Sequence, residues 1–78
     1  MPLNKSLTQQ HLLKHPEKLS RFSKVYIWSA EHRAWWRSEA SGYTNDIESA
    51  GIYEIDNAWG KVMHCDKSKR IIIYEATK

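Results

Sequence analysis

The sequence is organised around one stretch rich in aromatic and β-branched residues, Val25-Tyr-Ile-Trp-Ser-Ala-Glu-His-Arg-Ala-Trp-Trp-Arg37. Residues 25–29 and 34–37 both have the composition of a strand, because such side chains pack well on a pleated surface. The four residues between them are a usual loop length for an antiparallel hairpin. The stretch therefore predicts a β-hairpin in which Ser29 faces Ala34.

The two faces of this hairpin follow from the alternation of side chains along a strand. We expect the face that carries Ile27 and Trp36 to join the core. The other face then holds Tyr26, Trp28, Trp35 and Arg37. For Trp28 and Trp35 two interpretations stay open, burial in a small core and contact with a partner.

The second half of the chain predicts a helix and a final strand. From about Ile55 to His64, apolar residues recur at i, i+3, i+4, i+7 and i+8, which is the pattern of one buried helix stripe. Trp59 lies in this stripe, and we expect Gly60 to let the helix approach the sheet closely. Residues 70–75 predict a strand with four consecutive apolar residues, which leaves it no polar face.

The segment between hairpin and helix predicts one further turn. Thr44 is expected to cap a short helical turn that Gly51 ends. The fold class expected from all these elements is α+β: a small antiparallel sheet, formed by the β-hairpin and the C-terminal strand, with one helix packed on it. The order is β-β-α-β, preceded by an N-terminal helical arm.

Charge divides the chain near residue 24. Residues 1–24 carry five basic side chains against Glu17 alone, whereas residues 25–78 carry seven basic and eight acidic ones. We therefore distinguish a basic, partly helical N-terminal arm, residues 1–24, from a single α+β domain, residues 25–78. Such asymmetry is found in chains that bind nucleic acid or acidic proteins, and also in arms that are simply solvated.

Within the arm, Ser6 or Thr8 is expected to cap a helix that ends before Pro16. Residues 1–5 are expected to be mobile, because they have few apolar anchors. The second sheet face needs a cover, for which the sequence leaves three candidates: a second copy of the chain, a foreign partner, or the apolar side chains of the arm, Leu7, Leu12, Leu13, Leu19 and Phe22.

No spacing in the sequence is diagnostic of catalysis or of metal binding. His32 follows Glu31 in the hairpin loop, and Ser29 and Cys65 are available nucleophiles, but these positions define no nucleophile–base pair. Two further histidines lie four residues apart in the arm, yet a structural zinc site usually needs four ligands. We therefore expect no enzyme activity, no cofactor and no metal site.

Aromatic residues interleaved with basic ones form the strongest functional pattern. Trp, Tyr and Arg dominate the energetic centres of protein–protein interfaces, and aromatic rings beside Arg also bind single-stranded nucleic acid by stacking. We expect a partner-binding surface formed by seven residues: Tyr26, Trp28, His32, Arg33, Trp35, Arg37 and Tyr43.

The same region resembles a group of short phage and prophage proteins. Residues 28–36 match the pattern W-S-x-E-H-x-A-W-W, and residues 42–44 and 50–53 match G-Y-T and A-G-x-Y at similar spacing. Glu54 departs from the Ser or Thr helix cap of similar sequences, and residues 1–24 lie outside the resemblance. The resemblance implies a phage-type accessory protein, without naming a mechanism.

The expected function is therefore binding without catalysis. The resemblance suggests a host or phage protein as partner, with inhibition of a host protein or defence complex as one outcome and nucleic-acid binding through the arm and hairpin as the alternative. Cys65 is the lone cysteine of the 78 residues, and no apolar run is long enough to span a membrane. We expect a cytoplasmic protein of a bacterial host, without membrane contact, that is a monomer or a homodimer.

Overall fold

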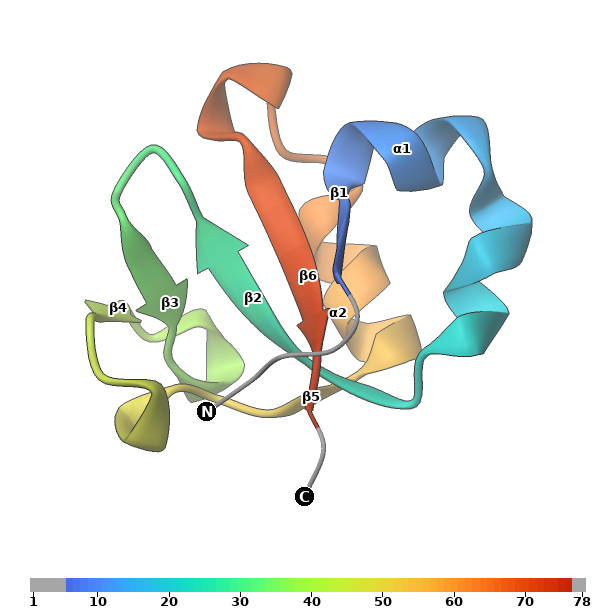
Figure 1. Cartoon of the computed structure of the whole chain (residues 1–78). Coiled ribbons are helices and arrows are strands. Elements are labelled where there is room, and N and C mark those ends of the chain that lie inside the picture. The colour runs from blue at the N-terminus through green and yellow to red at the C-terminus, as the bar shows by residue number, and fades with distance from the viewer. Residues whose placement is uncertain (1–5, 77–78) are drawn as a thin grey trace.

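An antiparallel six-stranded sheet organises the chain in the computed structural model, which describes residues 6–76 (Figure 1). The strand order is β1-β6-β2-β3-β4, and β5 pairs with β2 beside this path. The strands are β1 (Ser6–Thr8), β2 (Lys24–Ser29), β3 (Ala34–Trp36), β4 (Tyr43–Thr44), β5 (Tyr53–Glu54) and β6 (Ile71–Glu75). The helices are α1 (Gln9–Lys14) and α2 (Ile55–Val62), with short 3₁₀ segments η1 (Pro16–Arg21), η2 (Ser38–Ala40), η3 (Ile47–Ser49) and η4 (Lys67–Lys69). The α+β prediction is confirmed.

The two longest strands, β2 and β6, form the centre of the sheet. They pair along their whole lengths, from Val25↔Glu75 to Ser29↔Ile71. The opposite edge of β2 is shared: β5 pairs with its first half through Val25↔Tyr53, and β3 pairs with its second half. Strand β6 is covered on its own outer edge by β1, which explains how a strand of consecutive isoleucines can exist without an exposed edge.

The predicted hairpin register is confirmed. Trp28 pairs with Trp35 and Ser29 pairs with Ala34, as a four-residue loop requires. Arg33, the last loop residue, has φ +53°, so the turn uses a left-handed residue just before β3. Because this register is fixed, the two adjacent tryptophans of β3 point to opposite faces of the sheet.

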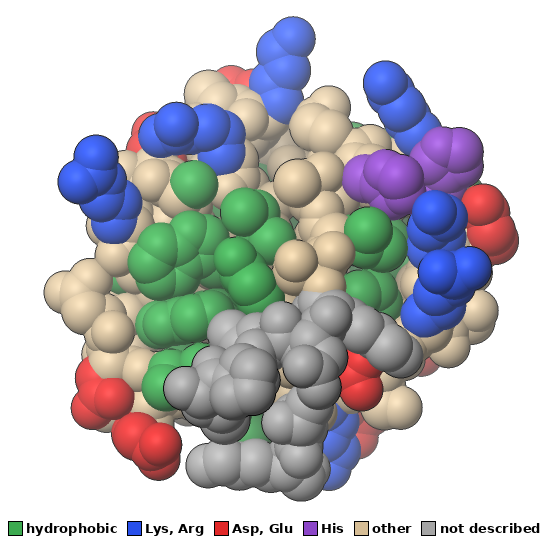
Figure 2. Space-filling view, viewed as in Figure 1, with side chains coloured by type: hydrophobic (Ala, Val, Ile, Leu, Met, Phe, Trp, Pro, Cys, Tyr) green, Lys and Arg blue, Asp and Glu red, His purple; other side chains and the backbone are tan. Residues whose placement is uncertain are grey.

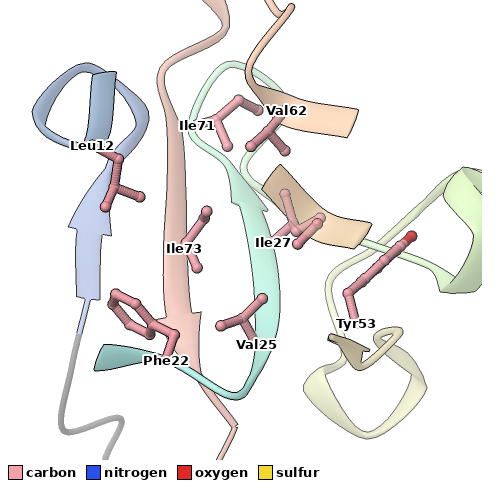
Figure 3. Packing of buried hydrophobic residues seen from close by; sticks show 9 residues of the cluster. Leu12, Phe22, Val25, Ile27, Tyr53, Val62, Ile71 and Ile73 are labelled. Atoms are coloured by element: carbon pink, nitrogen blue, oxygen red, sulfur yellow. The ribbon is translucent and has the colours of Figure 1, made fainter. Parts of the chain in front are cut away.

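The core lies between the sheet and α2 (Figure 3). Ala58 and Val62 on α2 are fully buried against side chains of β2 and β6, and Trp36 and Trp59 are partly buried beside them. Nine buried residues form the cluster: Leu12, Phe22, Val25, Ile27, Tyr53, Ala58, Val62, Ile71 and Ile73. The expected role of Gly60 is wrong, because this residue is exposed and a Cβ built on it would meet nothing within 4 Å.

The N-terminal segment is part of this same core, so the division of the chain at residue 24 does not follow the structure. Thr8 caps α1 by accepting a hydrogen bond from the His11 amide (3.1 Å), as expected, but residues 6–8 also form β1. Leu12 has no exposed surface and Phe22 is 5% exposed. These side chains pack on the α2 side of the sheet and do not cover its second face. The expected mobility of residues 1–5 lies outside the described residues.

Between β3 and α2 the chain is held by Tyr53 and Gly51. The Tyr53 hydroxyl accepts a hydrogen bond from the Ala40 amide (2.9 Å) and donates one to the Arg37 carbonyl. The Gly51 amide donates to the Trp36 carbonyl (2.9 Å), and a Cβ at this position would lie 2.5 Å from the backbone of Ser38. Gly51 is therefore needed for a close approach of two backbone segments, a role that the sequence did not indicate.

The expected helical turn in this segment is present with a different cap. Segment η3 is capped by Asp46, whose carboxylate accepts from the Glu48 amide (3.0 Å). Thr44 instead accepts from the Asp46 amide (3.1 Å), and Tyr53 lies in β5 and not in the helix. No helix among residues 6–76 has the length and apolar character needed to cross a membrane.

Candidate partner-binding surface

The sheet face opposite α2 carries a group of aromatic and aliphatic side chains that we call the aromatic face. Its members come from three adjacent strands: Tyr26, Trp28, Trp35, Ile72 and Tyr74. They share a face because Trp28 pairs with both Trp35 and Ile72 in the ladder, and alternation places the core side chains on the other side. Figure 2, viewed from this side, shows hydrophobic side chains gathered over the middle of the sheet and Lys and Arg side chains at its upper left and right borders.

Trp35 is the centre of the aromatic face. Its ring meets Trp28, Tyr74 and Tyr26 at edge-on angles, with centroids 4.9, 5.3 and 5.6 Å apart respectively. Edge-to-face pairs of this kind add about 0.5–1.5 kcal/mol each beyond burial. Trp28, Trp35, Ile72 and Tyr74 are all partly exposed, so the cluster is still open to solvent.

Tyr26 does not have the role that the sequence suggested. It lies on the aromatic face as expected, but its side chain is only 2% exposed. It therefore supports Trp35 from below and offers no surface to a partner.

His32 and Tyr43 form a second and separate feature. Their rings stack with centroids 4.1 Å apart and an interplanar angle of 16°. Tyr43 pairs with Trp36 across β3 and β4, so it belongs to the α2 side of the sheet. Both side chains are exposed, as are Arg33 and Arg37. The seven residues predicted as one surface therefore do not lie together: Trp28 and Trp35 belong to the aromatic face, and Tyr43 belongs to the opposite side.

The hairpin loop places Ser29, Glu31 and His32 together without forming a catalytic relay. Ser29 Oγ lies 3.2 Å from His32 Nδ1, and Glu31 Oε1 lies 3.8 Å from the same nitrogen. A relay needs the acid and the nucleophile on opposite ring nitrogens. Ser29 is also only 1% exposed, and Glu31 pairs with Lys69 at 3.5 Å. This group fixes the loop and does not present a nucleophile.

Cys65 and the histidine pair of α1 show no arrangement for chemistry. Burial raises the pKa of the Cys65 thiol, which disfavours the reactive thiolate at neutral pH. The rings of His11, in α1, and His15, at its C-terminal cap, lie 4.9 Å apart. In the described part of the chain, no group of three or more His, Cys, Asp or Glu side chains could hold a metal ion.

A cavity of about 430 Å³ adjoins the aromatic face at one end of the sheet. It lies where β1 runs into α1, beside the hairpin loop and η4, and its lining residues are Thr8, Gln9, Gln10, Ala30, Lys67, Arg70, Ile71 and Ile72. Nothing in the sequence indicates this cavity, because its walls come from three segments far apart along the chain, residues 8–10, 30 and 67–72. The sequence predicts Arg70 only as the first residue of the final strand.

Comparison with known proteins adds no identification. No family model, no curated protein and no solved structure matches the chain.

Proposed function

We propose that this protein is a small accessory protein of phage or prophage type that binds a partner protein in the bacterial cytoplasm and acts without catalysis. The aromatic face is the observation that carries this proposal. The core contacts of α1, η1 and α2 use the opposite side of the sheet. Trp28, Trp35, Ile72 and Tyr74 keep part of their surface exposed, and the rings of Trp28 and Trp35 pack against each other.

The chemistry of the aromatic face favours a protein partner. Burying apolar surface stabilises a complex by about 2.5 kcal/mol per 100 Å² before the costs of association. Trp and Tyr anchors on a rigid sheet lose little conformational entropy on binding, which is why they are common at interface centres. A protein of this size can inhibit stoichiometrically by occupying a surface, and the resemblance to phage proteins suggests a host protein or defence complex as its target.

The test is affinity capture from bacterial lysate with the wild-type chain and matched variants. Trp28→Ala removes an exposed anchor of the aromatic face, and Trp28→Thr removes it while keeping a strand-favouring residue. Met63→Ala is the control, since Met63 is an exposed apolar residue (40%) at the end of α2. We expect a captured protein that is lost with both Trp28 variants and kept with Met63→Ala.

Thermal unfolding of each variant shows whether the sheet is intact. Capture that is equal for folded Trp28 variants and the wild-type chain would contradict a role for the aromatic face. Capture that disappears after nuclease treatment would contradict a protein partner.

Single-stranded nucleic acid is the second candidate partner, favoured by the exposed His32–Tyr43 stack and by the exposed Arg33, which follows His32 in the chain. Aromatic rings beside cations bind bases by stacking and phosphates by charge. Binding of this kind weakens steeply as salt rises, because condensed counterions are released. Fluorescence anisotropy of a labelled oligothymidylate at two salt concentrations tests it, and Tyr43→Ala is expected to weaken binding if this candidate is correct.

A further inference from the structure

The cavity beside the aromatic face combines an apolar floor with polar and basic walls. Ile71 and Ile72 of β6 and Ala30 of the hairpin loop supply apolar surface. Thr8 and Gln10 supply a hydroxyl and an amide at the start of α1, and both residues are exposed. At about 430 Å³, the space fits one or two side chains of a bound segment or a small organic molecule.

Two basic residues of this cavity have no acidic partner among residues 6–76. Lys67 and Arg70 lie in its wall and take part in none of the ion pairs of the described chain. The neighbouring Lys69, by contrast, is paired with Glu31 at 3.5 Å. Two unpaired cations beside an apolar floor are complementary to an anionic group attached to an apolar body.

The backbone that carries these cations is tied to the hairpin loop. Arg70 has φ +51° and ψ +58°, at the junction between η4 and β6. Its carbonyl accepts a hydrogen bond from the Ala30 amide (3.2 Å), and the Lys69 carbonyl accepts one from the Glu31 amide (3.4 Å). The backbone wall of the cavity is thus joined to the hairpin loop, and the exposed Lys67 and Arg70 side chains extend from it.

The cavity and the aromatic face form one continuous surface through Ile72. This residue lines the cavity and also pairs with Trp28 on β2 and with Thr8 on β1. A segment lying across Trp28 toward β1 would therefore reach the cavity next. Figure 2 shows the Lys and Arg side chains at the border of the hydrophobic surface and not within it.

We propose that the partner protein docks an acidic side chain, Asp or Glu flanked by apolar residues, into this cavity against Lys67 and Arg70. This inference rests on the proposed function, because it names the chemistry of the segment that the aromatic face receives. The carboxylate takes charge-assisted hydrogen bonds from the two cations, and the flanking apolar side chains lie on Ile72 and Trp28.

The experiment is a titration of the ¹⁵N-labelled protein with two short peptides, acetyl-Ile-Glu-Ile-amide and its uncharged match acetyl-Ile-Gln-Ile-amide, followed by amide chemical shifts. We expect shifts at residues 8–10, 30 and 67–72, and affinity for the Glu peptide roughly tenfold above that for the Gln peptide. Equal affinities, or shifts confined to other parts of the chain, would overturn the proposal. So would an oligothymidylate that shifts the same amides at lower concentration than the Glu peptide.

Three variants assign the effect to the cavity. Lys67→Gln and Arg70→Asn each remove one cation, and Asn tolerates the left-handed backbone of position 70. Lys61→Gln removes the same charge from an exposed position on α2, outside the cavity. We expect each cavity variant to weaken Glu-peptide binding about three- to tenfold and Lys61→Gln to leave it unchanged.

The same variants separate this inference from the proposed function. Partner capture that is lost with Trp28→Ala but kept at full strength with Arg70→Asn would overturn the acidic anchor and leave the aromatic face as the binding surface. If Trp28→Ala leaves capture unchanged, the proposed function fails, and peptide titration still decides whether the cavity selects a carboxylate.

Discussion

Tyr53 shows how one side chain can hold an irregular connection in place. Its hydroxyl bonds to the Ala40 amide and the Arg37 carbonyl, while its ring is 4% exposed and belongs to the core. Tyr53→Phe keeps the ring but removes both hydrogen bonds, and the Ala40 amide and the Arg37 carbonyl then keep only the bond between them (3.2 Å), so we expect a loss of about 1–2 kcal/mol in the free energy of unfolding. Urea denaturation measures this loss. Tyr43→Phe is the control, because the Tyr43 ring is 43% exposed and a surface change should stay within about 0.5 kcal/mol.

The same hydroxyl makes the stability of the protein depend on pH in the alkaline range. Burial raises the pKa of Tyr53 above its ordinary value of 10.0. The folded state therefore keeps the proton longer than the unfolded state does, so stability falls as pH rises from 10.0 toward the raised pKa. Tyr53→Phe has no such proton. The stability difference between wild type and variant should narrow above pH 10.0, and a constant difference would contradict this account.

The surroundings of Gly51 and Gly60 predict opposite effects on stability when each is replaced by Ala. A Cβ on Gly51 would lie 2.5 Å from Ser38 Cα and 2.9 Å from the Arg37 carbonyl carbon, both backbone atoms that cannot move aside cheaply. Gly51→Ala should therefore cost about 1–3 kcal/mol. Gly60, inside α2, has no atom within 4 Å of its Cβ position, so Gly60→Ala should stabilise by about 0.5–1 kcal/mol. Thermal unfolding of both variants measures these changes in stability, and equal changes would refute the close approach at Gly51.

At the scale of elements, α1 and α2 are joined by Gln9. Its amide Nε2 donates to the carbonyls of Val62 (2.6 Å) and Cys65 (2.8 Å) at the end of α2, and the side chain is 1% exposed. Gln9→Ala leaves both carbonyls without this donor and should cost about 2–3 kcal/mol. Gln10→Ala makes the same change at an exposed position of the same helix and should stay within about 0.5 kcal/mol. Similar losses at the two positions, measured by urea denaturation, would refute the link.

Elements with their own periodic pattern were predictable from the sequence, and elements defined by their neighbours were not. The hairpin and α2 follow from local composition, and β6 follows from a run of isoleucines. Strands β1, β4 and β5 have two or three residues each and form because a partner strand is present, so nothing in their own sequences marks them. The predicted partner-binding surface grouped Trp35 with Tyr43 because they are close in the sequence. The two side chains lie on opposite faces of the sheet, because Tyr43 pairs with Trp36. The sequence does not show this register, since it depends on the path of the loop between β3 and β4.

At the scale of the whole molecule, residues 6–22 and the rest of the described chain share one hydrophobic core. Leu12 has no exposed surface, whereas the adjacent Leu13 is 46% exposed. Leu12→Ala should therefore cost about 2–5 kcal/mol, through lost burial and a cavity in the hydrophobic core cluster. Leu13→Ala should change stability by less than about 0.5 kcal/mol. Calorimetric unfolding of both variants tests this, and a small effect at Leu12 would mean that the segment folds independently.

Removal of residues 1–22 is the strongest form of the same test. The truncated chain would lose β1, which covers the outer edge of β6, together with Leu12 and Phe22 from the core. The isoleucines of β6 would then lie on an open edge, and unpaired edges of this kind pair with other chains. We expect a chain that lacks a cooperative thermal transition and associates in solution, as measured by circular dichroism and light scattering. A truncated chain that stays monomeric and melts like the parent would contradict this expectation. It would support the division predicted from the sequence, in which the N-terminal segment is an arm outside the α+β domain.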